Sequence, residues 1–140
     1  SYFNGHFISP AASANASWTW HVPNWKKIPG SFRHKPFGGM KLLTAMQSGK
    51  ETTVKFTGRA IGAYVLAGPD AGAIEASIDD SEWKRVDLYH RHSRSLHYPR
   101  TVMFAADLKR GSHTARIRLS KISNSASKGT AARILQFTVN

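Results

Sequence analysis

The densest group of chemically active side chains in this sequence lies in the segment HRHSRSLHYPR, residues 90–100. It holds three histidines, three arginines and one tyrosine. Arginine and histidine donate hydrogen bonds to anions and to sugar hydroxyls, and a tyrosine ring offers a stacking face. We therefore predict that Tyr89, His97, Tyr98 and Arg100 contact an anionic or carbohydrate ligand. The alternative is a basic loop that only joins two strands.

A second group of candidate ligand contacts is aromatic, because three of the four tryptophans lie close together in the segment WTWHVPNW. On a strand, alternation puts Trp18 and Trp20 on the same face, and Trp25 follows a Pro-Asn turn. Exposed indoles stack on the apolar faces of sugar rings, so one interpretation is a binding platform made of these three tryptophans. In the alternative interpretation the indoles face the core of the domain.

Metal binding and catalysis find little support in the same residues. Residues 90–100 contain no carboxylate or thiol ligand and their arginines repel a cation, while the chain has no cysteine at all. Asp87 and His90 have a DxxH spacing, but an acid and a base without a nucleophile do not indicate catalysis. We predict no metal, no cofactor and no catalytic residue. An autonomous enzyme using Asp87, His90, His92 or His97 as acid or base is the alternative.

The charge of the chain is strongly positive, with 20 Lys and Arg against 8 Asp and Glu and a formal net charge of +12. Such a surface attracts acidic polysaccharide, nucleic acid, anionic lipid or an acidic domain. The basic residues are scattered through strands and loops, and no helix-turn-helix or RNA-binding signature is present, which argues against nucleic acid. The longest apolar stretch, residues 60–67, is too short to span a membrane, so no membrane partner is predicted.

The elements that position these residues read as strands, most clearly over residues 52–89. Residues 54–56 alternate apolar and polar, as a strand with one buried face requires. Residues 60–67 are apolar throughout and predict a strand buried on both faces. Residues 74–78 alternate again, and Asp79-Asp80-Ser81 supplies a tight turn into a second strand, which predicts a β-hairpin.

The rest of the chain continues this pattern of short strands and turns. Further strands are predicted over residues 1–8, 17–22, 40–46, 101–105, 113–119 and 133–139, with loops over 9–16, 26–39, 90–100 and 122–130. No helical period extends beyond a turn or two. Roughly nine short strands separated by turn signals predict an all-β, jelly-roll-like antiparallel β-sandwich with little or no helix, forming one domain over residues 1–140.

The inward faces of these strands predict the core. Truncating one of the large core residues to Ala should cost about 2 to 5 kcal/mol of stability. The predicted core residues are Val54, Phe56, Val65, Ile78, Val86, Phe104, Ile117 and Phe137.

Several segments of the chain together resemble a known type of domain. These are SYFNGHF at the start, FTGRAIGAYVLAGPDAGAIEASIDD and VDLYHRHSRSLHYPRTVMFAADLKRGSHTARIRLS in the middle, and SKGTAARILQFTVN at the end. They resemble the β-sandwich domain that lies after the catalytic domain in bacterial SGNH/GDSL-type hydrolases. The resemblance covers nearly the whole chain. One departure is the hairpin turn, where such domains usually carry Gly and this chain has Asp79-Asp80-Ser81.

This resemblance implies a secreted or periplasmic parent esterase that acts on acylated carbohydrate or a similar ester. The chain itself has no Gly-Asp-Ser nucleophile segment and no recognisable Asn-bearing oxyanion block, so the resemblance does not imply a catalytic role for it. We therefore predict a non-catalytic accessory domain that binds carbohydrate or acidic polysaccharide, or shapes the substrate site of an SGNH-type catalytic domain in the same parent chain. The alternatives are a structural docking domain without a ligand and a polyanion-binding domain.

Overall fold

The computed structural model describes residues 5–32 and 38–140 and contains eleven strands and two short 3-10 helices within them. The predicted strand at residues 1–8 is observed from His6 onward, and residues 1–4 and 33–37 lie outside the described residues. The elements are β1 (His6–Ile8), η1 (Pro10–Ser13), β2 (Trp18–His21), η2 (Trp25–Lys27), β3 (Ser31–Phe32), β4 (Leu42–Ala45), β5 (Glu51–Gly58), β6 (Ile61–Ala67), β7 (Ala73–Ile78), β8 (Lys84–Asp87), β9 (Leu96–Ala105), β10 (Gly111–Leu119) and β11 (Ala132–Val139).

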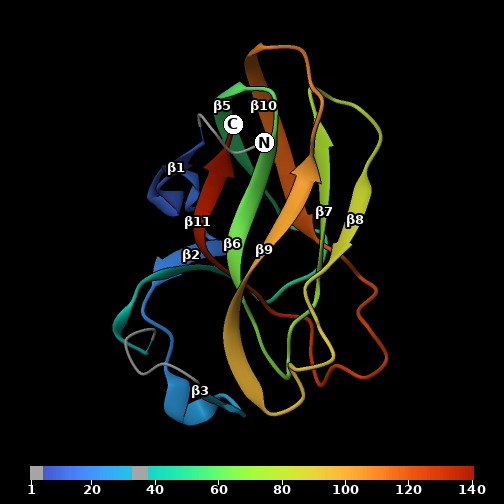
Figure 1. The fold of residues 1–140 in the computed structure, drawn as a ribbon. Helices are drawn as coiled ribbons and strands as arrows, with labels where there is room; N and C mark the ends of the chain where they lie inside the picture. The colour runs from blue at the N-terminus through green and yellow to red at the C-terminus, as the bar shows by residue number, and fades with distance from the viewer. Residues whose placement is uncertain (1–4, 33–37) are drawn as a thin grey trace.

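The strands form two sheets that pack face to face, which confirms the predicted all-β sandwich (Figure 1). The large sheet has the order β2-β4-β11-β6-β9-β3, and β1 pairs with the remaining length of β11. The small sheet has the order β5-β10-β7-β8. Neighbouring strands are antiparallel except β3 and β9, which run parallel.

Side-chain patterns explain which faces of these strands are buried. In β5 Val54 and Phe56 are buried while Lys55 between them is exposed, because only one face of the small sheet meets the large sheet. In β6 every residue except Tyr64 is buried. One face of β6 lines the main core, and Leu66 on the other face packs in a second, smaller cluster, so the predicted two-sided burial of this strand is confirmed.

The main core lies between the two sheets and contains most of the residues predicted for it. Seven of the eight predicted core residues are buried: Val54, Phe56, Val65, Ile78, Phe104, Ile117 and Phe137. Val86 is half-buried and packs against this core. The difference arises because β8 is an edge strand of the small sheet, where cover from the other sheet is incomplete.

The predicted hairpin turn after β7 is present. Asp79 and Asp80 have φ angles of 51° and 61°, and the Ser81 amide donates to the Ile78 carbonyl at 2.9 Å. Positive φ at consecutive turn residues matches the right-handed twist of a hairpin, and Asp tolerates this conformation better than most residues other than Gly. Two aspartates therefore make a turn for which glycine is the usual choice.

Two loop predictions are wrong in part: β9 begins at Leu96 and not at residue 101, and β3 (Ser31–Phe32) lies within the predicted loop 26–39. Residues 96–100 were predicted as part of a loop on account of their polar side chains. In the structure residues 98–100 pair with β6, with Tyr98 opposite Ala67 and Arg100 opposite Val65, and residues 96–97 pair with β3. Backbone pairing with a buried neighbour extends the strand through a segment whose own sequence has no strand pattern.

A buried ion pair joins β11 to the turn that follows β6. Arg133 is 2% exposed and donates two hydrogen bonds to Asp70, at 2.7 and 2.8 Å. Burial alone would raise the pKa of Asp70, but the hydrogen bond and positive charge of Arg133 outweigh burial and lower this pKa. The pair fixes the position of the loops at this end of the sandwich.

Candidate functional site

The outer face of the large sheet presents an exposed aromatic ring, with threonines on the neighbouring strands. Strand register places Phe7 of β1 opposite Thr138 of β11, and Thr138 opposite Gly62 of β6. Phe7 is 66% exposed, an unusual degree for a phenylalanine on a sheet face. The next row contains Tyr64 and Thr101, of which Tyr64 is half-buried and Thr101 is exposed.

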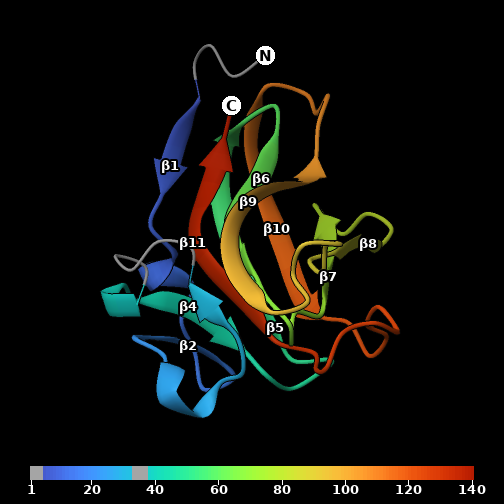
Figure 2. The ribbon, with the colours of Figure 1, turned by 60° about the horizontal axis from the view of Figure 1, so that its bottom comes forward.

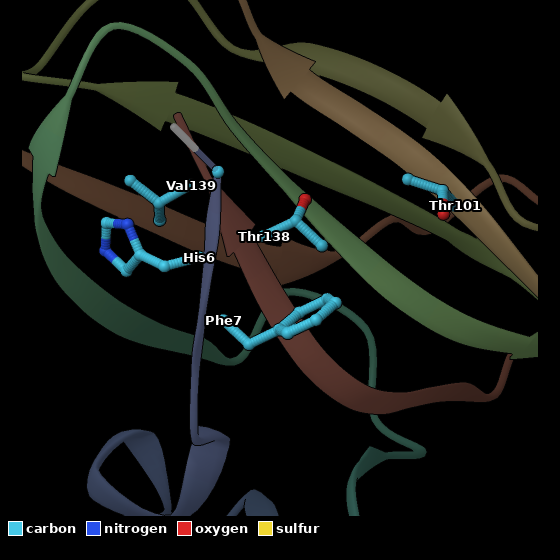
Figure 3. A pocket seen from close by; sticks show the side chains of 6 residues that line it. His6, Phe7, Thr101, Thr138 and Val139 are labelled. Carbon is cyan, nitrogen blue, oxygen red and sulfur yellow. The ribbon is translucent and has the colours of Figure 1, made fainter. Parts of the chain in front are cut away.

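A hollow of about 360 Å³ lies beside Phe7 on this face, between β1 and β9. Figure 3 shows the Phe7 ring on one side of β1 and the His6 imidazole on the other, with Thr138 on β11 and Thr101 on β9. The lining residues are Gly5, His6, Phe7, Thr101, Thr138 and Val139.

Gly62 forms the sheet surface next to Thr138, and no side chain fits at this position. A Cβ on Gly62 would lie 2.3 Å from the Val102 carbonyl oxygen and 2.7 Å from the sulfur of Met103. The buried Thr138 hydroxyl oxygen has no hydrogen-bond partner among the described residues. An aromatic ring beside hydroxyl groups can stack on the apolar face of a small ring and hydrogen-bond its substituents.

Trp18 and Trp20 do not contribute to this face, which corrects the predicted tryptophan platform for Trp18. Both point toward the inside of the sandwich, because β2 pairs with β4 and places Trp18 opposite Ala45 and Trp20 opposite Leu43. Trp18 is 0% exposed, and its indole nitrogen donates to the Lys50 carbonyl at 2.9 Å. Trp20 is half-buried against the main core.

Trp25 lies on the opposite, outer side of the large sheet, away from the other two tryptophans. It packs on the small cluster of Leu42, Leu66 and Leu135. The guanidinium carbon of Arg133 lies 5.3 Å from the centre of the Trp25 ring, and the ring of His97 meets it edge-on at 4.9 Å. The three tryptophans therefore do not form one platform, and a ligand contact of Trp25 alone stays a prediction.

His97 is a buried structural residue, which corrects its prediction as a ligand contact. It is 1% exposed, and its Nε2 donates to the Pro29 carbonyl at 2.8 Å. A Cβ on Gly68 would lie 2.0 Å from Nδ1 of His97, so only glycine permits this packing. Burial lowers the pKa of His97 and the nearby charge of Arg133 lowers it further, although the Pro29 bond opposes them.

Tyr89, Tyr98 and Arg100 are half-buried where β9 approaches the end of β8. Tyr89 packs against the main core, and the hydroxyl oxygen of Tyr98 is buried with the ring of His90 6.0 Å away, centre to centre. Arg100 donates a long hydrogen bond of 3.5 Å to the Leu88 carbonyl. Burial lowers the pKa of His90, and the positive charge of Arg100 lowers it further. Ligand contacts by Tyr89, Tyr98 and Arg100 stay predictions.

A feature that the sequence analysis missed lies on the outer face of the small sheet. The guanidinium carbons of Arg118 and Arg116 lie 3.8 and 5.1 Å from the centre of the Trp83 ring. Both arginines are also paired with carboxylates, Arg118 with Glu75 and Arg116 with Glu51, each at 2.8 Å. The alternation of Arg116 and Arg118 along β10 is the sequence signal for this arrangement. Phe7 was also missed, because an apolar residue on a strand is normally assigned to the core.

His113 on β10 bridges two acceptors and is expected to make stability depend on pH. Its Nδ1 lies 2.5 Å from a carboxylate oxygen of Asp79 and its Nε2 lies 2.5 Å from the Lys109 carbonyl oxygen. Neither acceptor can donate, so both bonds require a doubly protonated ring. The Asp79 hydrogen bond, followed by the Lys109 bond, raises the pKa of His113 above 6.5. The His113 hydrogen bond lowers the pKa of Asp79 below 3.8.

The bridge between His113 and Asp79 should stabilise the fold fully between pH 3.8, the ordinary pKa of the Asp79 carboxyl, and pH 6.5, the ordinary pKa of the His113 ring. This stabilisation should be lost at lower and at higher pH. A group with a raised folded pKa stabilises below its unfolded pKa, and this contribution disappears as the pH rises through the folded pKa. We expect the melting temperature of the native chain to fall as the pH rises above 6.5, and that of His113→Gln to fall less. The melting temperature of Asp79→Asn should likewise fall less than that of the native chain as the pH rises above 6.5. If the melting temperatures of both variants fall as steeply as that of the native chain, the bridge is contradicted.

The described residues contain no group of three or more His, Cys, Asp or Glu side chains that could hold a metal ion. Nor does any helix among them have the length and apolar character needed to cross a membrane.

Comparisons with known proteins identify shared folds at low sequence identity. No protein-family model matches the chain, and no curated protein sequence matches it. A two-domain esterase active on acetylated mannans, co-crystallised with mannopentaose, superposes with a TM-score of 0.61 and 11% identity over 96% of this chain, which spans 36% of that esterase. A family two carbohydrate esterase from Cellvibrio japonicus superposes with a TM-score of 0.54 and 13% identity, covering 96% of this chain and 33% of the esterase.

A third similar structure matches this chain over almost its full length. It is the CBM36-1 domain of a multidomain xylanase from the hindgut metagenome of Trinervitermes trinervoides. It superposes with a TM-score of 0.56 and 10% identity over 98% of this chain and 97% of that domain. At these identities the comparisons establish the fold alone: this chain has the β-sandwich fold found in these carbohydrate esterases and in this CBM36 domain.

Proposed function

We propose that the chain is a non-catalytic domain that binds carbohydrate on the outer face of its large sheet. The observation that carries this proposal is the exposed ring of Phe7 in a hollow that is also lined by the exposed Thr101. A pyranose ring has an apolar face that stacks on an aromatic side chain and hydroxyl groups that hydrogen-bond with threonine. The shared fold with domains of carbohydrate-active proteins supports the same assignment.

The assignment as non-catalytic is supported by the contacts of three titratable side chains, of which Asp87 and His97 are among the candidate acids and bases. Asp87 accepts hydrogen bonds from the Tyr89 amide and from the Asn124 side chain, at 3.0 and 3.2 Å. The His97 ring is packed in the interior, and both nitrogens of the His113 ring already face acceptors. The hydrogen bonds of Asp87 and His113 join these groups to amides, a carbonyl and a carboxylate and not to a nucleophilic hydroxyl, so a binding role fits the geometry better than hydrolysis.

The proposal extends to the parent protein. We infer an SGNH/GDSL-type esterase, secreted or periplasmic, in which this domain accompanies the catalytic domain. Its support is the resemblance of residues such as AGPDAG and LHYPR, together with the two carbohydrate esterases that share the fold. Sequencing the parent reading frame tests this extension, because a frame without a hydrolase domain would refute it.

Replacing Phe7 with Ala is expected to weaken binding of a neutral oligosaccharide without changing stability. Stacking that covers roughly 80 Å² of apolar surface contributes about 2 kcal/mol, which is a roughly thirtyfold change in Kd. The measurement is isothermal titration calorimetry with mannopentaose and with xylopentaose. The melting temperature should stay that of the native chain, because the ring is mostly exposed.

Ile122→Ala is the matched control for this prediction. Ile122 is 69% exposed and lies on the loop before β11, outside the hollow. Its truncation removes a similar apolar surface and should leave the oligosaccharide affinity unchanged. Equal loss of affinity in both variants, or no binding of any neutral oligosaccharide by the native chain, would refute the proposed site.

A further inference from the structure

Several loops meet at one end of the sandwich, around β3 and the beginning of β9 (Figures 1 and 2). The Ser31 amide donates to the Ser95 carbonyl at 3.0 Å, and the Lys128 amide donates to the Pro69 carbonyl at 2.8 Å. The first contact joins residues 25–32 to 87–97, and the second joins 68–71 to 121–131. The Asn124 side chain connects the two pairs by donating to Asp87 at 3.2 Å. The exposed cations of these loops, which we call the basic end, are Lys26, Lys27, Arg91, Arg94, Lys121 and Lys128.

The positive charge of the basic end exceeds the negative charge in the described parts of these loops. They contain two acids, Asp70 and Asp87. Asp70 is buried and paired with Arg133, and Asp87 accepts hydrogen bonds from Asn124 and from a backbone amide. None of the six cations forms an ion pair with a described residue.

The opposite arrangement occurs on the outer face of the small sheet. There Arg116 is paired with Glu51 and Asp80, and Arg118 is paired with Glu75. Arg116 and Arg118 are therefore neutralised on that face, whereas the six cations of the basic end have no ion pair with a described residue. Like charges on neighbouring loops repel one another, and a bound polyanion relieves this repulsion.

We propose that the basic end binds an acidic polysaccharide, a glycan chain that carries carboxylate or sulfate groups. The cations sit on long side chains from several loops, and they suit the repeated charges of a linear chain better than one small ion. The choice of a glycan rests on the proposed function, in which the Phe7 hollow binds neutral sugar. Single-stranded nucleic acid binds through base stacking on exposed aromatic rings, but in these loops Trp25 packs against Arg133 and His97, and Tyr89 packs against the main core.

The test compares two variants that lose the same charge at different places. Arg91→Gln/Arg94→Gln/Lys128→Gln removes three cations of the basic end. Lys55→Gln/Lys109→Gln/Arg110→Gln removes three exposed cations on β5 and on the turn before β10. The two variants have the same net charge, so the non-specific attraction of the protein to any polyanion falls equally in both. Binding is measured by calorimetry with polygalacturonate and with a sulfated galactan, at low and high salt.

The basic-end variant should bind the acidic glycans about tenfold more weakly than the native chain, because exposed charge contacts are individually weak and three are removed. The control variant should stay within about twofold, and the native affinity should fall steeply with salt. Preference for polygalacturonate or for the sulfated galactan identifies the anionic group. Equal losses in the two variants, or tighter binding of single-stranded DNA than of either glycan, would overturn the proposal.

Mannopentaose separates this proposal from the proposed function. The basic-end variant should bind mannopentaose with the affinity of the native chain. Phe7→Ala should bind mannopentaose much more weakly but keep most of its affinity for acidic glycan. If the native chain binds mannopentaose, and its affinity for acidic glycans is no higher at low salt than at high salt, the basic-end site is refuted and the Phe7 site is supported. If the basic-end variant alone loses acidic glycan while mannopentaose never binds, the Phe7 site fails and the basic end stands.

Discussion

Replacing Arg133 with Met should destabilise the fold by about 3 to 5 kcal/mol, because it leaves the carboxylate of Asp70 buried without its partner. Arg133 is 2% exposed and donates both hydrogen bonds of the pair. Urea denaturation at neutral pH measures the loss. Exposed ion pairs contribute much less, so Arg118→Met, which breaks the half-exposed pair with Glu75, should cost about 1 to 2 kcal/mol including its contact with Trp83.

The dependence on pH provides a second readout of the same substitution. In the native chain Arg133 lowers the pKa of Asp70 below 3.8, so this contribution is present above that value and is lost as the pH falls through the folded pKa. Without Arg133, burial raises the pKa, and the stability difference between variant and native chain should shrink on acidification. The double variant Asp70→Leu/Arg133→Met should recover much of the stability, since no charge stays buried. A loss no larger than that of Arg118→Met would refute this account.

Replacing Trp18 with Ala should cost about 3 to 5 kcal/mol, because it opens a cavity in the main core. The ring is 0% exposed and packs between the sheets, and its indole nitrogen donates to the Lys50 carbonyl. Thermal denaturation followed by circular dichroism measures the effect. Trp83→Ala is the control: Trp83 is half-buried on the outer face of the small sheet, so its removal should cost less.

Trp18→Phe tests whether this residue has any role in binding. Phenylalanine fills most of the space and keeps the fold, but it cannot donate to the Lys50 carbonyl, so a loss of about 1 to 2 kcal/mol is expected. Because Trp18 has no exposed surface, the affinity for neutral oligosaccharide should not change. A folded Trp18→Phe variant with weakened sugar binding would show that the tryptophan is a ligand contact.

Several features of this chain follow from the sequence because they depend on neighbouring residues alone. The alternation of Val54, Lys55 and Phe56 predicts a strand with one buried face, and the structure has that strand with that face buried. Asp79 and Asp80 predict the tight turn, because their short polar side chains tolerate positive φ. The excess of positive charge is likewise a property of composition.

The identity of the candidate site depended on contacts between residues far apart in the sequence. Alternation places Trp18 and Trp20 on one face of a strand, but pairing of β2 with β4 decides that this face is the inner one. Pairing of β1 with β11 turns Phe7 outward, and the close approach of Gly68 and Gly30 makes room for His97 in the interior. Local pattern determines which side chains share a face, whereas the partner strand and the opposing sheet determine whether that face meets the core or the solvent.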